Sequence, residues 1–83
     1  MSCQSANEQI AQDIDALGLK CPEPVMLLHS AIRKIQGGEC VRLVATDPST
    51  ERDVRNFCQF LGHELLHFDR EDARLTYVIQ KRV

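Results

Sequence analysis

The sequence predicts an α/β (α+β) two-layer sandwich, with a four-stranded mixed sheet that carries two helices on one face. Two segments repeat apolar residues at steps of three and four, which is typical of amphipathic helices. Four shorter segments read as strands, most of them alternating polar and apolar residues as half-buried strands do, and the order along the chain is βαβαββ. Because each helical segment has one apolar stripe, both helices are expected on the same face of the sheet. The sequence leaves the order of the strands open.

The N-terminal end is expected to be a short tail followed by a strand. Residues 1–11 are mostly polar and are predicted to form a flexible tail, whereas residues 12–83 form a single domain. Residues 12–17 alternate polar and apolar side chains, which predicts a short strand with Ile14 and Ala16 on its buried face.

The first helix is predicted for residues 22–36. Pro22 and Pro24 suit the first helical turn, where the missing N–H of proline is not needed, and Gly37-Gly38 ends the helix. Its apolar stripe consists of Val25, Leu28, Ile32 and Ile35.

A second helix and three further strands follow. The helix is expected to begin at Ser49 or Thr50, where Thr50 and Asp53 resemble a shortened capping box. Cys58 falls on its apolar stripe and is expected to be a buried thiol, whereas Phe60 lies on a flank, as a docking surface or a packed rim. The remaining predicted ranges are strand 40–46, helix 50–61, strand 63–69 and strand 74–81.

Cys21 stands where the first strand gives way to the first helix. A thiol at a helix start feels the positive end of the helix dipole, which favours the reactive thiolate, although Glu23 opposes this. We therefore expect an activated but not strongly acidic thiol. Pro24 occupies the position at which a Cys-x-x-Cys pair has its resolving cysteine, so no neighbour in sequence can release a group bound to this sulfur. The alternative is a buried structural cysteine.

The composition excludes several classes of function. The formal net charge is −2, without a basic run, so nucleic-acid binding has no electrostatic support. There is no signal-peptide pattern and no stretch of about 20 apolar residues, so we expect a cytoplasmic protein without membrane contact. The four cysteines form no Cys-x-x-Cys pair and are expected to be reduced. No cysteine pair accompanies His63 and His67, so no metal site is predicted.

The cysteine segment and its companions identify a family resemblance. The segment is Asp15-Ala16-Leu17-Gly18-Leu19-Lys20-Cys21-Pro22-Glu23-Pro24-Val25-Met26. It is followed by Thr46-Asp47-Pro48, Arg52-Asp53, Phe57-Cys58 and His63-Glu64-Leu65. With these motifs, the chain resembles the TusA/SirA-like family of sulfur carrier proteins from residue 13 to about residue 82.

The resemblance implies a sulfurtransferase that works within a protein relay. A cysteine desulfurase would load sulfur onto Cys21 as a persulfide, and a TusBCD-type complex would accept it for 2-thiouridine at the tRNA wobble position. Pyridoxal phosphate belongs to the donor, so the carrier, expected to be a monomer, needs no cofactor. Asp47 would either assist Cys21 or cap a helix. The implied partner-binding or supporting residues are Pro22, Glu23, Pro24, Met26, Arg33, Asp47, Arg52 and Phe60.

Two alternatives remain at this stage. Related carriers serve molybdenum cofactor assembly or sulfur oxidation by the same chemistry. The predicted shape also resembles the C-terminal domain of a translation initiation factor, which would make the chain a binding module with an incidental cysteine. The absence of aromatic and basic RNA-binding motifs argues against direct RNA binding.

Overall fold

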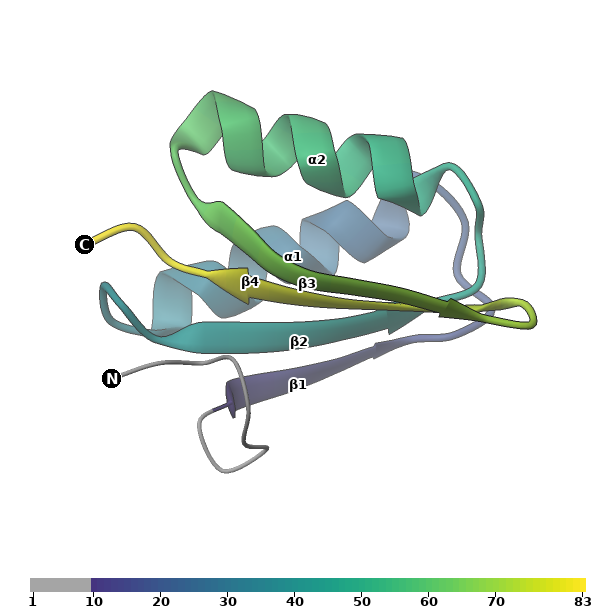
Figure 1. Cartoon of the computed structure of the whole chain (residues 1–83), viewed down its shortest axis with the longest axis horizontal. Coiled ribbons are helices and arrows are strands. Elements are labelled where there is room, and N and C mark those ends of the chain that lie inside the picture. The colour runs from purple at the N-terminus through teal and green to yellow at the C-terminus, as the bar shows by residue number, and fades with distance from the viewer. Residues whose placement is uncertain (1–9) are drawn as a thin grey trace.

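The computed structural model describes residues 10–83, and its six elements follow the predicted order βαβαββ. They are β1 (Ile10–Ala16), α1 (Glu23–Lys34), β2 (Cys40–Ala45), α2 (Thr50–Leu61), β3 (Glu64–Glu71) and β4 (Arg74–Gln80) (Figure 1).

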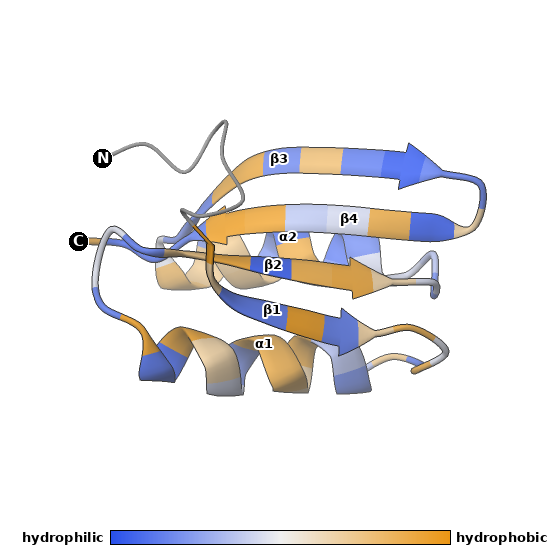
Figure 2. Ribbon diagram, turned by 90° about the horizontal axis from the view of Figure 1, so that it is seen from below, coloured by the Kyte–Doolittle hydropathy of each residue, from blue (hydrophilic) through white to orange (hydrophobic). Residues whose placement is uncertain are grey.

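The four strands form one mixed sheet in the order β1-β2-β4-β3. The strands β1 and β2 are parallel and are joined through α1, whereas β4 runs antiparallel to both of its neighbours. Both helices cover the same face of the sheet, and Figure 2 views the sheet from the face that they leave uncovered. The predicted two-layer sandwich is therefore confirmed, and the structure supplies the strand order.

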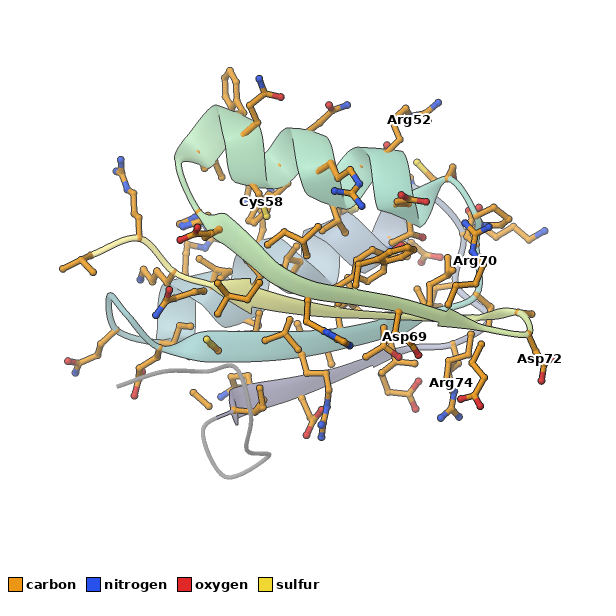
Figure 3. The ribbon with its side chains drawn as sticks, in the orientation of Figure 1. Arg52, Cys58, Asp69, Arg70, Asp72 and Arg74 are labelled. Carbon is orange, nitrogen blue, oxygen red and sulfur yellow. The ribbon has the colours of Figure 1, made fainter. Side chains whose placement is uncertain are left out.

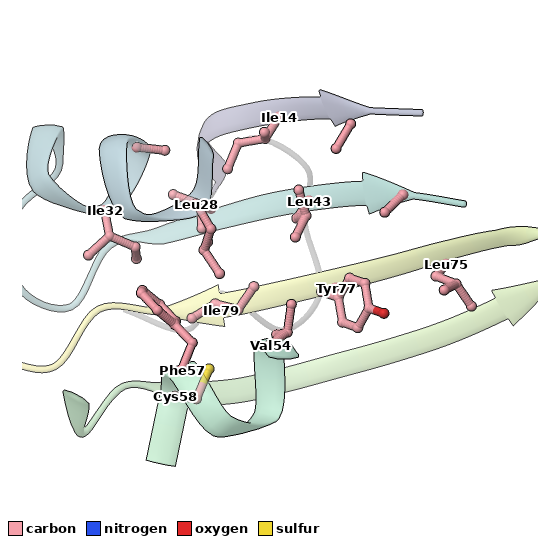
Figure 4. Close-up of a cluster of buried hydrophobic side chains, with 14 of the residues drawn as sticks. Ile14, Leu28, Ile32, Leu43, Val54, Phe57, Cys58, Leu75, Tyr77 and Ile79 are labelled. Carbon is pink, nitrogen blue, oxygen red and sulfur yellow. The ribbon is translucent and has the colours of Figure 1, made fainter. Parts of the chain in front are cut away.

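The main core lies between the sheet and the two helices. Strand residues that alternate along β2 and β4 point into it, as the two-residue period of a strand requires. Figure 4 shows this cluster, to which the sheet contributes Ile14, Leu43, Leu75, Tyr77 and Ile79 and the helices contribute Leu28, Ile32, Val54, Phe57 and Cys58. Burial of one such aliphatic or aromatic side chain stabilises the fold by about 1.5–3 kcal/mol.

Strand β1 begins two residues before the predicted strand. A register shift between Ile10 and Gln12 directs Ile10 to the uncovered face of the sheet. There it packs against a second cluster, which contains Cys40 and Val78. The predicted tail therefore ends too late in the chain, and the rest of it, residues 1–9, lies outside the described residues.

Strand β3 contains a similar irregularity. Leu65 and Leu66 are adjacent, so in a regular strand their side chains would point to opposite faces. A shift in pairing lies between Leu65 and His67; Leu65 packs on the main core, whereas Leu66 packs on the second cluster. One strand therefore contributes side chains to both faces of the sheet.

Within residues 10–83, neither helix is long and apolar enough to cross a bilayer.

Candidate functional site

Cys21 lies at the carboxyl ends of the parallel strands β1 and β2, in the loop between β1 and α1. A second loop, residues 46–49 between β2 and α2, accepts two hydrogen bonds from this first loop. The N–H of Gly18 donates to Thr46 Oγ1 at 2.9 Å, and the N–H of Cys21 donates to Asp47 Oδ2 at 2.8 Å. Gly18 has φ +79°, a conformation that favours glycine. The two loops therefore form one site.

Helix α1 begins one residue later than the predicted helix. Pro22 is its N-cap residue, the Cys21–Pro22 peptide bond is cis, and the last helical residue is Lys34. Cys21 consequently precedes the cap and does not occupy it. The helix dipole acts mainly within the first turn, so the charges around the thiol gain in importance.

The strongest interaction of the thiol is with a carboxylate. Cys21 is exposed, and its Sγ donates to Asp53 Oδ2 at 2.7 Å. This hydrogen bond is the largest cause that raises the pKa of Cys21 above its ordinary value, and desolvation and the charges of Asp53 and Asp47 add to it. Ser49 acts in the opposite direction. The expectation of an activated thiol is therefore wrong for the free protein, because carboxylates face the sulfur from α2 and its preceding loop.

Asp47 shapes the backbone on both sides of the site. Besides the Cys21 N–H, it accepts hydrogen bonds at Oδ1 from the N–H of Ser49 at 3.0 Å and from Ser49 Oγ at 2.9 Å. These bonds, with the one from Cys21 as the largest cause, lower the pKa of Asp47. The helix-capping role that the sequence left open for Asp47 is not found, because the N-cap residue of α2 is Ser49 and the helix has no side-chain cap bond; Asp47 instead holds the backbone of Cys21.

Asp53 is a site residue that was not predicted from the sequence. The expected capping box with Thr50 does not form, because Thr50 is buried, its hydroxyl has no partner among the described residues, and α2 has no side-chain cap bond. The Asp53 carboxylate is directed to Cys21 instead. No local pattern links two residues that lie 32 positions apart. The available signals were that both follow parallel strands whose ends converge and that Arg52-Asp53 is one of the motifs of the family resemblance.

An apolar groove opens beside the thiol between the two helices. We call it the α1–α2 groove; it has a volume of about 410 Å³. Phe60, on its rim, is 89% exposed, so the flank position predicted from the sequence is a free surface. The residues that line the groove are Cys21, Pro22, Val25, His29, Asp53, Asn56, Phe57, Phe60 and Leu61.

The other predicted site residues are distributed unevenly around Cys21. Glu23 and Met26 are exposed in the first turn of α1, with Met26 at 61%, whereas Pro24 is buried. Arg52 projects from the first turn of α2 and pairs with Asp53 at 3.4 Å (Figure 3). Arg33 is in the last turn of α1, about 15 Å along the helix from Glu23 at 1.5 Å per residue. The structure therefore does not bring Arg33 to the thiol.

The two remaining described cysteines lie elsewhere in the fold. Cys58 points from α2 toward the sheet, where it is buried as predicted, and burial raises its pKa to about 11 (Figure 3). Cys40 opens β2 with its side chain on the uncovered face of the sheet, away from both the helices and the site.

His63 contacts Arg82 and Phe57. The Nδ1 atom of His63 accepts a hydrogen bond from the backbone N–H of Arg82 at 3.1 Å, and its ring lies 5.4 Å from that of Phe57. In the part of the chain that the structure describes, no three His, Cys, Asp or Glu side chains are grouped so that they could hold a metal ion.

Comparison with known proteins gives a consistent family assignment. The family model described as "Sulfurtransferase TusA" matches residues 12–81. A sulfur carrier protein TusA from Pseudomonas putida is 51% identical over 69 residues, which cover 83% of this chain and 86% of the relative. A protein of the same name from Pseudomonas syringae pv. syringae is 45% identical over 82 residues, which cover 99% and 98%.

A solved structure supports the fold independently. The crystal structure of a SirA-like protein from Desulfitobacterium hafniense matches with a TM-score of 0.76, covering 87% of this chain and 99% of that one. At 19% sequence identity, this likeness concerns the fold alone.

Proposed function

The chain belongs to the TusA family of sulfurtransferases, and from this premise we propose that it carries sulfur on Cys21 as a persulfide. The observation that carries the proposal is the exposed free thiol of Cys21 beside an apolar groove. The other free thiol in residues 10–83, Cys58, is buried. Pro24 stands where a resolving cysteine would be, so a sulfur on Cys21 persists until a partner removes it.

The transfer step exchanges one sulfur–sulfur bond for another. The Cys21 thiolate attacks the outer sulfur of a persulfide on the donor, the donor's sulfur–sulfur bond breaks, and the donor cysteine leaves as a thiolate. Cys21 gives up its proton before the attack and the donor thiolate takes one afterwards. No net oxidation occurs, so the carrier requires no resident cofactor in this proposal.

We propose a cysteine desulfurase as donor, with pyridoxal phosphate on that enzyme, and a TusBCD-type complex as acceptor. The product of the relay would be 2-thiouridine at the tRNA wobble position. The α1–α2 groove supports a protein partner, because Phe60 offers an exposed aromatic ring close to the thiol. The net charge of −2 favours protein contacts over direct tRNA binding. Monomeric state and cytoplasmic location remain predictions.

The test measures sulfur on the intact protein. Incubation with a cysteine desulfurase, pyridoxal phosphate and cysteine should add one sulfur atom, which dithiothreitol should remove. Cys21→Ser should abolish the addition while its circular dichroism spectrum stays unchanged, since the side chain is exposed. Cys58→Ser is the matched control and should still accept sulfur. Full loading of the Cys21→Ser protein would contradict the proposal.

A further inference from the structure

We propose that Asp53 sets how tightly Cys21 holds sulfur, because its carboxylate stabilises the unloaded thiol and repels the loaded persulfide. The inference rests on the proposed function and adds a residue that touches the reacting sulfur. Its consequence is a carrier that releases sulfur readily, as a relay protein requires.

The Asp53 carboxylate is held in place from two sides. Its Oδ2 accepts a hydrogen bond from the Cys21 thiol at 2.7 Å, and its Oδ1 lies 3.4 Å from Arg52 Nε. The backbone N–H of Asp53 donates to the carbonyl oxygen of Ser49 at 3.2 Å, and the side chain is only 21% exposed. The position next to the sulfur therefore belongs to an ordered part of α2.

The carboxylate stabilises the thiol and does not serve as its base. A carboxylate is a far weaker base than a thiolate. A proton shared between Cys21 and Asp53 therefore stays on sulfur. The hydrogen bond favours the protonated, unloaded state of Cys21, in agreement with the raised pKa of this thiol.

Loading removes the feature that makes this contact favourable. In a persulfide, Sγ carries a second sulfur in place of its hydrogen, so Asp53 Oδ2 loses its donor. The hydrogen on the outer sulfur of a persulfide is more acidic than that of a thiol, so the loaded group is largely an anion at neutral pH. The Asp53 carboxylate then faces a negative charge at short range, the charge of Asp47 adds to the repulsion, and the loaded state is disfavoured.

Few charges near the sulfur offset this repulsion. The groups that face it are Asp53 from α2 and Asp47 and Ser49 from the loop before α2. The cations nearest to these carboxylates are Arg52, next to Asp53, and Lys20, whose charge acts on Asp47. Arg52 is 71% exposed at its side chain, so solvent screens it. The carboxylates therefore dominate the balance at Sγ.

The experiment measures how sulfur is divided between the protein and a small thiol. In the exchange, Cys21–SH and glutathione persulfide give Cys21–S–SH and glutathione; one sulfur–sulfur bond breaks and one forms. Wild type and Asp53→Asn are equilibrated with glutathione persulfide and glutathione at a fixed ratio, and intact mass gives the loaded fraction. The loaded-to-unloaded ratio should rise about threefold in the variant, the scale of one solvent-exposed charge interaction.

A second arm follows the same variant with iodoacetamide near neutral pH. Alkylation of Cys21 should accelerate by about threefold, because the thiolate no longer forms beside the Asp53 charge. Asp69→Asn is the matched control: it removes the same charge from β3, at the opposite edge of the sheet from β1, and should change neither quantity.

Two further variants separate charge from structure. Asp53→Glu keeps the charge and should show the same loaded-to-unloaded ratio as wild type. Asp53→Ser removes the charge with a different side chain and should show the same ratio as Asp53→Asn. An unchanged or lower loaded ratio in the folded neutral variants, or an equal rise in Asp53→Glu, overturns the inference. If wild type accepts sulfur and Cys21→Ser does not, Cys21 remains the carrier even when the role of Asp53 fails.

Discussion

Cys21 and Cys58 are free thiols in the described part of the chain, and the pKa of each is raised for a different reason. At Cys21 the main cause is the hydrogen bond to Asp53, on an exposed loop. At Cys58 the main cause is burial in the core, where 5% of the residue is exposed and the pKa reaches about 11. One thiol is held protonated mainly by a hydrogen bond to a carboxylate and the other by the exclusion of water.

The two cysteines differ in how an incoming sulfur could reach them. Sulfur exchange requires the incoming sulfur to approach the thiolate from outside the protein. Cys21 offers this approach across the α1–α2 groove, whereas Cys58 packs among the core side chains. Access to the sulfur separates the two cysteines, and the carboxylates then adjust the reactivity of the accessible one.

The largest expected effect is on the relative alkylation rates of the two thiols. In the native protein near neutral pH, iodoacetamide should label Cys21 at least about a hundredfold faster than Cys58, because Cys58 reacts only after the fold opens. Peptide mapping after timed exposure measures both rates. In urea the two rates should converge. Native alkylation rates within about threefold of each other would contradict the claim that Cys21 is accessible and Cys58 is not.

A second prediction exchanges each thiol for a hydroxyl. Cys58→Ser should lower the free energy of unfolding by about 1–3 kcal/mol, because the hydroxyl is buried without a partner. Cys21→Ser should leave the urea midpoint unchanged, since its side chain is exposed. Urea denaturation followed by circular dichroism compares them. Equal midpoints for the two variants would show that Cys58 contributes nothing to the core.

The third prediction concerns the surface next to Cys21. Phe60→Ala should slow sulfur loading by the desulfurase on the order of fivefold, the scale of one aromatic interface residue. Its urea midpoint should stay unchanged, because the side chain is 89% exposed. Leu27→Ala is the control: Leu27 is also exposed, but it lies on the side of α1 that faces β1. Identical loading rates in both variants would exclude docking through the groove.

The fourth prediction is a pH dependence that belongs to Cys58. Its folded pKa of about 11 exceeds the ordinary value of 9.0, so the unfolded chain loses this proton first as the pH rises. The stability that Cys58 contributes is therefore complete below pH 9.0 and lost as the pH rises to about 11. Urea midpoints of wild type should fall faster across this window than those of Cys58→Ala. Parallel curves would contradict the burial of this thiol.

Much of this comparison could be predicted from the sequence. The steps of three and four residues along α2 placed Cys58 in the core and Phe60 outside it, and both predictions are confirmed. Such patterns are local, because a helix repeats every 3.6 residues whatever it packs against. The same reasoning gave the order of the elements and the face of the sheet that the helices cover.

The electrostatics of Cys21 could not be predicted in this way. The contact with Asp53 depends on how α2 is placed beside the loop after β1, and that placement follows from the strand order, which the sequence left open. The local influences visible in the sequence were the helix dipole and the opposing charge of Glu23, and the balance expected between them suggested the wrong direction for the pKa of Cys21. The register shifts at Ile10 and Leu65 were likewise set by packing on two faces of the sheet.

The most direct test locates the sulfur on the wild-type protein. After loading by a cysteine desulfurase, free thiols and persulfides are blocked with iodoacetamide, the protein is digested, and each cysteine peptide is examined by mass spectrometry. The account predicts the additional sulfur on the peptide that contains Cys21 and none on the peptide that contains Cys58. Sulfur found mainly on the Cys58 peptide would contradict it.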